Sequence, residues 1–477
     1  MEHTHSQNQT FKKAPIVALL LSGAFIAILN QTLMITAIPP IMDEMHVTAN
    51  TAQWLTTVFM LVNGVMIPVS AFLIERFSTR QLFITAMGIF AVGTVIAGIA
   101  PNYGILLFGR VVQSSGAGIM LPLMQTVFLM IFPIEKRGAA MGLIGLVISF
   151  APAIGPALSG WVTANYSWRV LFAIILPIAI IDIIIAIFAM RNVTQLTYPK
   201  VDIISIILSS FGFGGLLYGF SNAGNNGWAS TNVIIALAIG AVSLCLFIWR
   251  QMRMEHPMLE FRVFKYKIFT IGTIIGMITF MGLIGAETLI PLYMQNMRGF
   301  TAMESGLVLL PGALITGIMS PITGRIFDKV GARWLAILGL SVITLGTFPY
   351  TNLTPSTSFA YLTIMYAVRM LGIAMVMMPV TTAALNRLPR HLIPHGTAMN
   401  NTMRQVSGSV GTALLVTVMT NSIVSAKQQT VPHPEIHGVN IAFFVATILA
   451  LIGVGLSFFI KKTSPSAEKQ ESNKMEA

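Results

Sequence analysis

The chain has 477 residues, of which 55% are hydrophobic and only 9% are charged, and its mean hydropathy is +0.79. Soluble domains carry about 25% charged residues, so this composition excludes a water-soluble protein and indicates a membrane protein with many spans. The net charge of +12 would suggest a nucleic-acid partner in a soluble protein, but here the basic residues fall in short loops, where they report membrane topology. We therefore expect the lipid bilayer, and no nucleic acid, as a partner.

Polar tails, residues 1–13 and 461–477, flank the apolar part of the chain, and the first tail lacks the features of a cleavable signal. Between them we predict fourteen membrane-spanning helices, because about 20 apolar residues cross the hydrocarbon core and a helix satisfies its own backbone polar groups. The predicted spans cover roughly residues 14–37, 52–74, 82–100, 104–132, 138–162, 168–190, 201–220, 231–250, 268–294, 304–324, 332–350, 357–386, 396–421 and 438–460.

Lys and Arg residues are distributed unequally between the two sides of this predicted bundle. If both termini are cytoplasmic, 22 of the 28 fall in cytoplasmic segments and three fall in outer loops. The remaining three lie inside predicted helices, at Arg110, Arg369 and Arg404. The bias matches the positive-inside rule and predicts a plasma-membrane protein with both termini in the cytoplasm.

The first predicted span ends in the stretch "LNQTLMITAIPP", residues 29–40, which contains the neighbouring amides Asn30 and Gln31. Amide side chains both donate and accept hydrogen bonds, so these two residues are candidates for contact with a ligand or a facing helix. Three further amides inside predicted spans are weaker candidates for a substrate cavity: Asn63, Gln125 and Asn400.

Several segments of the first half recur in the same order in the second half, at an offset of 253 to 259 residues. The matched pairs are "AFLIERFSTR" (71–80) with "GRIFDKVGAR" (324–333), "RGAAMGL" (137–143) with "HGTAMNN" (395–401), Arg110 with Arg369, and "QTLM" (31–34) with "ETLI" (287–290). Such a repeat indicates a transporter with its substrate site between two halves near the bilayer midplane.

The repeat predicts the domain organisation. We expect a six-helix half at 14–190, a two-helix insert with its linkers at 191–267, and a second six-helix half at 268–460.

The repeated loop after the second and tenth spans combines glycine, acids and basic residues. Glycine permits unusual backbone dihedrals in a tight turn, and an acid there is able to bind a helix N-terminus or an arginine. We interpret the two loops as a conformational latch whose charged residues are Glu75, Arg76, Arg80, Asp328, Lys329 and Arg333.

The fifth span, "GLVISFAPAIGPALSG" (145–160), is rich in small residues and contains Pro152 and Pro156. Small residues allow close helix approach, and each proline removes a backbone donor and favours a kink.

Acids inside the predicted spans are few. Asp182 lies among isoleucines of the sixth span, and Glu287 occupies the ninth span at the position that matches Gln31. A carboxyl within the membrane is a functional-site candidate because it is able to load and release a proton. We therefore expect Glu287 to be the main proton-coupling acid, with Asp182 in a subsidiary role.

Together these motifs resemble the fourteen-spanner drug:proton antiporter branch of the major facilitator superfamily, and within it the lincomycin-resistance type exporters of Gram-positive bacteria, over essentially the whole chain. The loop motif departs from the family pattern at Ser78 and Glu75, which replace Gly and Asp. The largest departure is Asn30, since the family commonly has an aspartate there that is thought to carry the coupled proton. The coupling is therefore expected to depend on the second half.

The resemblance also implies roles for individual residues. Arg110 is expected to face the central cavity and take part in proton coupling, and Arg369, Arg404 and Gln405 are expected to act in gating. The span 5 motif is expected to seal the halves and to mark efflux. Its matching positions are Gly145, Ala151, Gly155, Pro156 and Gly160.

The resemblance implies an all-α major facilitator fold and a multidrug exporter. Hydrophobic, often cationic drugs would leave in exchange for protons by alternating access, and the protein would act as a monomer without cofactor or metal. An exporter of one endogenous amphipathic solute and a membrane-embedded enzyme remain alternatives. An uptake symporter is disfavoured by the span 5 motif, and an ATP-driven pump by the lack of a phosphate-binding loop.

Overall fold

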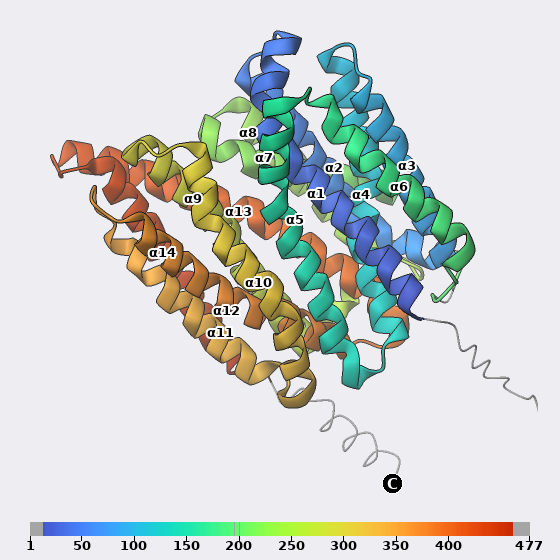
Figure 1. The fold of residues 1–477 in the computed structure, drawn as a ribbon. Coiled ribbons are helices and arrows are strands. Elements are labelled where there is room, and N and C mark those ends of the chain that lie inside the picture. Colours follow the sequence, from blue (N-terminus) through green and yellow to red (C-terminus); the bar gives the residue numbers. More distant parts are fainter. Residues whose placement is uncertain (1–12, 195, 200, 461–477) are drawn as a thin grey trace, which may run out of the picture.

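The computed structural model describes residues 13–194, 196–199 and 201–460, and this part of the chain consists of helices and short loops without a strand (Figure 1). Fourteen of its helices are long and apolar enough to cross a membrane. The predicted all-α class with fourteen spans is therefore confirmed. The predicted tails, apart from Lys13, lie outside the described residues.

The helices follow one another in three groups along the chain. The first group is α1 (Lys13–Met45), α2 (Ala49–Arg76), α3 (Thr79–Gly98), α4 (Tyr103–Ile131), α5 (Arg137–Asn165) and α6 (Arg169–Ala189). The second is α7 (Ile203–Asn226) and α8 (Thr231–Arg253). The third is α9 (Lys267–Leu292), α10 (Ala302–Val330), α11 (Ala332–Thr347), α12 (Phe359–Asn386), α13 (Ile393–Gln428) and α14 (Pro434–Ser457).

Short helical segments complete the elements. They are η1 (Ile134–Lys136), η2 (Phe261–Lys265), the π-helix η3 (Tyr293–Met297), η4 (Phe348–Asn352) and η5 (Arg390–Leu392).

Helix α1 is longer than the predicted span, which ended at residue 37. It continues through Pro39 and Pro40 to Met45, because Ile41 is fully buried and extends the packed face of the helix. Near its end, Glu44 accepts a hydrogen bond of 2.7 Å from the Trp168 indole and pairs with the guanidinium at the start of α6.

The two six-helix groups meet most closely where α5 packs against α10. A side chain on Gly138 would collide with the Gly324 carbonyl oxygen, and one on Gly317 would collide with the Phe150 ring. By contrast, a Cβ on Gly160, further along α5, would meet nothing within 4 Å. In Figure 1 the two helices converge at their lower ends and diverge towards their upper ends.

We call the end where α5 begins and α10 ends the basic end, because it carries Arg76 at the end of α2, Lys136 just before α5 and Arg325 near the end of α10. The other end is called the opposite end. The close packing of the two halves is therefore concentrated towards the basic end.

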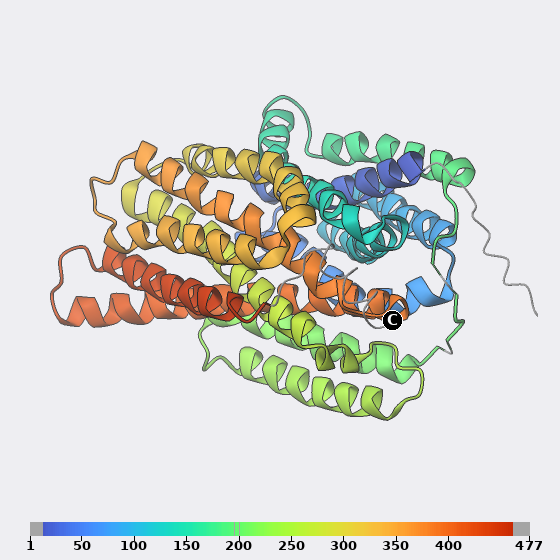
Figure 2. The same ribbon diagram turned by 90° about the horizontal axis from the view of Figure 1, so that it is seen from below.

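The α7–α8 pair lies to one side of both halves (Figure 2). Its two helices approach closely because Gly215 faces Gly240, where an added Cβ would lie 2.8 Å from the opposing Cα. Helix α7 packs against α2 of the first half and α13 of the second.

Two aromatic contacts join this pair to the halves near the opposite end. Trp54 of α2 stacks on Tyr218 of α7 with ring centroids 5.6 Å apart. The indole of Trp228, in the loop between α7 and α8, donates a 2.7 Å hydrogen bond to the hydroxyl of Thr417 on α13.

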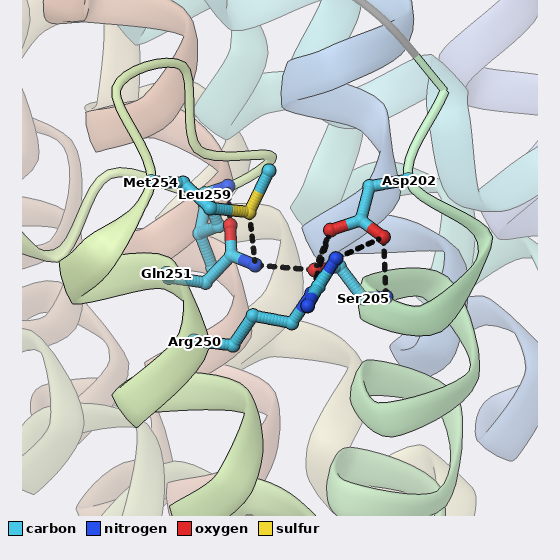
Figure 3. Close-up of polar contacts among 6 residues, drawn as sticks. All are labelled: Asp202, Ser205, Arg250, Gln251, Met254 and Leu259. Atoms are coloured by element: carbon cyan, nitrogen blue, oxygen red, sulfur yellow. Dashed lines mark hydrogen bonds and ion pairs between the residues drawn. The ribbon is translucent and has the colours of Figure 1, made fainter.

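A polar network fixes the α7–α8 pair at the basic end (Figure 3). Arg250 donates two hydrogen bonds, of 2.9 and 3.0 Å, to the carboxylate of Asp202, which caps α7. Burial opposes ionisation of Asp202, but the hydrogen bonds from Arg250 and Ser205 outweigh it and lower the pKa of Asp202. Gln251 binds the Ser205 hydroxyl at 2.6 Å and accepts from the Leu259 amide at 3.2 Å, which ties the loop after α8 to the same network.

Candidate functional site

The sequence places Arg110 about two turns inside the start of α4, and the structure buries it completely. The Arg110 guanidinium donates to the side-chain oxygens of Asn30 on α1 and of Gln113, the latter at 2.7 Å, and its centre lies 4.2 Å from the centroid of the Phe59 ring. Asn30, an amide where the family commonly has an acid, is thus the residue that Arg110 contacts. One guanidinium nitrogen, Nη2, has no hydrogen-bond partner.

The matched arginine of the second half, Arg369 on α12, has a different environment. It donates to the carbonyl oxygen of Gly282 on α9 and, at 3.1 Å, to the Thr347 hydroxyl on α11. It also lines a cavity of about one water molecule in size between α9, α11, α12 and α14. Glu287 is an electrostatic neighbour of this guanidinium. The second half therefore has an acid near its arginine, whereas the first half has an amide.

Glu287 lies on α9, two residues after Gly285 and directly after Ala286, both of which are buried. Its own side chain is exposed. An accessible carboxyl that is also an electrostatic neighbour of a buried arginine is a candidate for taking up and releasing a proton.

Asp182 is 5% exposed on α6, a helix that packs against α1 and α3. Ser22 of α1 lies within hydrogen-bonding reach of it, and its Oδ2 atom has no partner. The structure therefore keeps Asp182 inside the first half, on a different helix group from Glu287.

At the basic end, Asp328 of α10 reaches across to the first turn of α5. Its carboxylate accepts hydrogen bonds from the backbone amides of Gly138 and Ala139, at 2.7 and 2.9 Å. An acid at a helix N-terminus satisfies free amides and interacts favourably with the helix dipole. This contact joins the second half to the first.

The other copy of the loop makes a similar contact in the reverse direction. Glu75 of α2 lies 2.8 Å from Nε2 of His395, in the first turn of α13. The ring nitrogen Nδ1 of His395 accepts from the Glu260 amide at 3.4 Å, so the segment that follows the α7–α8 pair also touches this contact. Sequence reasoning did not select His395, although the repeat aligns it with Arg137 at the start of α5 and so contained the signal.

The remaining latch residues take different positions. Arg76 donates to the Pro199 carbonyl oxygen at 2.6 Å, Arg80 and Lys329 are exposed, and Arg333 is half-buried. Of the six predicted latch residues, Glu75 and Asp328 thus bind residues of the other half.

The small residues of α5 face two partners. A Cβ on Gly145 would lie 2.7 Å from the Ser320 side chain of α10, and one on Gly155 would collide with Thr32 of α1. Ala151 is fully buried and Pro156 is half-buried. The motif residues therefore serve the α5–α10 contact at the basic end and the α1–α5 contact nearer the opposite end.

Besides Asn30, two of the predicted cavity amides are buried in this conformation. Gln125 accepts a 2.7 Å hydrogen bond from Asn401 of α13, which brings α4 and α13 together across the halves. Asn400 donates to Thr273 of α9 at 3.3 Å. Gln31 and Asn63 are half-buried.

Arg404 lies on α13, one helical turn beyond Asn401 from the basic end. Its side chain is 5% exposed and its guanidinium centre lies 5.0 Å from the centroid of the Phe280 ring on α9. Its Nε and Nη1 atoms have no hydrogen-bond partner. Gln405, the next residue, is half-buried and its side chain lies close to Gly64 of α2.

Comparison with known proteins gives consistent matches over nearly the whole chain. Residues 20–412 match the family model described as Major Facilitator Superfamily. An uncharacterized MFS-type transporter of Bacillus subtilis, YcnB, is 59% identical over 98% of this chain and 99% of its own. The lincomycin resistance protein LmrB of Bacillus subtilis is 44% identical over 97% of this chain and 98% of its own. Among solved structures, the human organic anion transporter MFSD10 superposes with a TM-score of 0.67 at 11% identity, over 93% of this chain and 99% of its own.

Proposed function

Because this chain belongs to the Major Facilitator Superfamily and is therefore a membrane transporter rather than an enzyme, we propose that it exports hydrophobic, often cationic drugs from the cell in exchange for protons. The observation that carries the proposal is the unequal pair of arginine sites: Glu287 lies beside Arg369 in one half, and the neutral Asn30 lies beside Arg110 in the other. Similarity to a lincomycin resistance protein over nearly the full length supports the drug substrate.

Glu287 has the role of proton carrier in this proposal. In the protonated state it is neutral and leaves Arg369 without a nearby negative charge. When a cationic drug binds from the cytoplasm, the carboxylate releases its proton and interacts with the drug instead, and reprotonation from outside releases the drug. Asp182 has a subsidiary role, and Arg110 holds the first half in place through Asn30 and Gln113.

The basic end is cytoplasmic in this proposal, as the distribution of Lys and Arg predicts. The contacts of Asp328 and of Glu75 then form a latch that holds the cytoplasmic side closed, and the structure corresponds to an outward-facing state. The two halves act as rigid groups that alternate around the Glu287 region.

Transport in inside-out vesicles tests the coupling. Wild-type protein should accumulate a cationic dye or lincomycin only when a pH gradient is imposed, and Glu287→Gln should lose about tenfold or more of this gradient-driven transport, equivalent to about 1.4 kcal/mol or more. Glu304→Gln is the matched control, because Glu304 is a half-buried acid in the capping box at the start of α10.

Three outcomes decide between the parts of the proposal. Gradient-driven transport that is unchanged in Glu287→Gln rules out Glu287 as the carrier. Wild-type transport that persists without any proton gradient rules out proton antiport. A folded wild-type protein that moves neither compound rules out drug export.

The orientation is tested separately with an impermeant maleimide on intact cells. In a Cys245→Ser background, which removes the single cysteine of the chain, cysteines at Arg298 and Lys427 should react, whereas cysteines at Arg80 and Lys329 should react only after permeabilisation. The reverse pattern would contradict a cytoplasmic basic end.

A further inference from the structure

Three arginines lie inside the described membrane helices away from the helix ends, and they differ in how many of their guanidinium nitrogens have a hydrogen-bond partner. Arg110 and Arg369 each donate to protein oxygens. Arg404 has no such acceptor for Nε or Nη1, and its side chain is 5% exposed. Arg404 is therefore a buried cation with two guanidinium nitrogens that have no hydrogen-bond partner in this conformation.

The environment of Arg404 supplies only part of the stabilisation that a buried guanidinium needs. An unpaired charge is costly in the membrane interior, and the cation–π contact with Phe280 offsets only part of this cost. Among the described residues, no carboxylate contacts Nε or Nη1 of Arg404. A buried cation of this kind is a site for an anionic acceptor.

The position of Arg404 makes the site part of the transport path. One turn nearer the basic end, Asn401 binds Gln125 and joins α13 to α4, so Arg404 lies just beyond the contact that closes the halves at that end. Helix α13 packs against α2, α4, α7 and α9, and the Arg404 side chain is buried. A ligand would therefore approach Arg404 from between the halves.

Helix α9 carries both Phe280, which contacts Arg404, and Glu287. Phe280 and Glu287 are seven residues apart, so they share one face of α9 and are separated by about 10 Å along its axis. A ligand anion at Arg404 is thus in contact with an aromatic ring and about two turns away from the acid. The spacing allows one molecule to place a carboxylate at Arg404 and a hydrophobic or cationic part near Glu287.

From this arrangement we infer that Arg404 is an anion-binding point of the transport path, and that the substrates include hydrophobic compounds that carry a carboxylate. The Nε–Nη edge of a guanidinium binds a carboxylate with two parallel hydrogen bonds, and the hydrophobic body packs against Phe280. The inference rests on the proposed function and adds a substrate class to it.

A binding experiment on purified full-length protein tests the inference with two fluorescent probes, pyrenebutyric acid and its methyl ester. The two differ in the carboxylate alone. At pH 7.5 the wild type should bind the acid about tenfold more tightly than the ester, relative to their partitioning into empty detergent micelles. Arg404→Gln should abolish this preference and leave ester binding within about twofold, and Arg404→Lys should retain part of it, since lysine keeps the charge but loses the paired geometry.

Arg298→Gln is the control, because Arg298 lies near the opposite end and should not affect the preference. A wild type that binds acid and ester equally overturns the inference, as does an Arg404→Gln variant that keeps the full preference. If Arg404→Gln does not fold, the wild-type preference and its reduction in Arg404→Lys decide the question.

Export of a cationic dye in inside-out vesicles separates this inference from the proposed function. Gradient-driven dye export together with equal binding of acid and ester overturns the anion site and leaves drug export intact. A clear preference for the acid without any drug or dye transport leaves the site intact and overturns drug export.

Discussion

At the scale of single residues, the matched arginines of the two halves, Arg110 and Arg369, have different partners. Arg110 contacts the neutral oxygen of Asn30, whereas Arg369 contacts a backbone carbonyl and has Glu287 as an electrostatic neighbour. The fold therefore preserves the position of the cation in both halves but places an acid beside it in only one. This asymmetry predicts that a carboxylate introduced beside Arg110 should allow the first half to take part in proton coupling.

Asn30→Asp places a carboxylate where Arg110 already has a donor. We expect a charge-assisted hydrogen bond in the first half, and we expect the double variant Asn30→Asp/Glu287→Gln to regain part of the gradient-driven transport that Glu287→Gln loses. The measurement is dye accumulation in inside-out vesicles at equal protein level. Gln31→Glu in the Glu287→Gln background is the comparison, because Gln31 is half-buried and the side-chain hydrogen bonds of Arg110 go to Asn30 and Gln113 instead. A double variant as inactive as Glu287→Gln would contradict a shared coupling role for the two arginine sites.

The repeat in the sequence was sufficient to pair Arg110 with Arg369 and Gln31 with Glu287. It could not identify their partners, because contacts such as Arg110 to Asn30 depend on which helix faces of α1 and α4 meet. His395 was overlooked for a related reason. It lies near a predicted span end, and only the folded chain brings Glu75 within 2.8 Å of it.

At the scale of elements, α5 and α10 form the contact on which closure of the basic end depends. Their backbones approach closely at Gly138 and Gly324, and Asp328 caps α5 next to this point. The sequence predicted the small residues of α5 and the acid of the loop, but treated them as separate motifs. The structure brings them to one surface because α10 ends where α5 begins.

Gly142→Ala should force this surface apart. A Cβ there would lie 2.6 Å from the Ser320 carbonyl oxygen and 2.7 Å from the Pro321 Cα, distances too short for packed atoms. We expect about a tenfold or larger shift towards a state that is open at the basic end, measured as a longer distance between spin labels at Arg80 and Lys329 in a Cys245→Ser background. Gly160→Ala is the matched control, because its Cβ would meet nothing within 4 Å. Equal distances in both variants would show that the α5–α10 contact does not set the closed state.

At the scale of the whole molecule, the α7–α8 pair connects two halves that must move relative to each other. Its basic end is held by the Asp202–Arg250 network and continues through Leu259 and Glu260 to His395 of the latch. The number and order of the helices followed from apolar runs and basic loops. The position of the α7–α8 pair beside α2 and α13 could not be predicted in this way, because apolar composition does not reveal which helices become neighbours.

Asp202→Asn tests the network through its pH dependence. The folded-state pKa of Asp202 is lowered, so the carboxylate stabilises the fold above its unfolded pKa of about 3.9 and this contribution is lost as pH falls through the lower folded pKa. The substitution should therefore lower stability by about 1–3 kcal/mol, equally at pH 5.5 and pH 8, when thermal unfolding is followed in detergent. Asp43→Asn, on an exposed acid near the end of α1, should have little effect. A penalty for Asp202→Asn that grows steadily between pH 5.5 and pH 8 would contradict the assignment.

The aromatic contacts of Trp54 with Tyr218 and of Trp228 with Thr417 attach the same helix pair to both halves near the opposite end. Each contact is worth about 0.5–1.5 kcal/mol, which is enough to delay a thermal fluctuation and too little to prevent it. We therefore expect these contacts to slow the movement of the two halves relative to each other, because each transport cycle must stretch or re-form at least one of them. The two contacts should therefore affect the rate of transport. Weakening them should change the turnover rate and leave substrate selectivity unchanged.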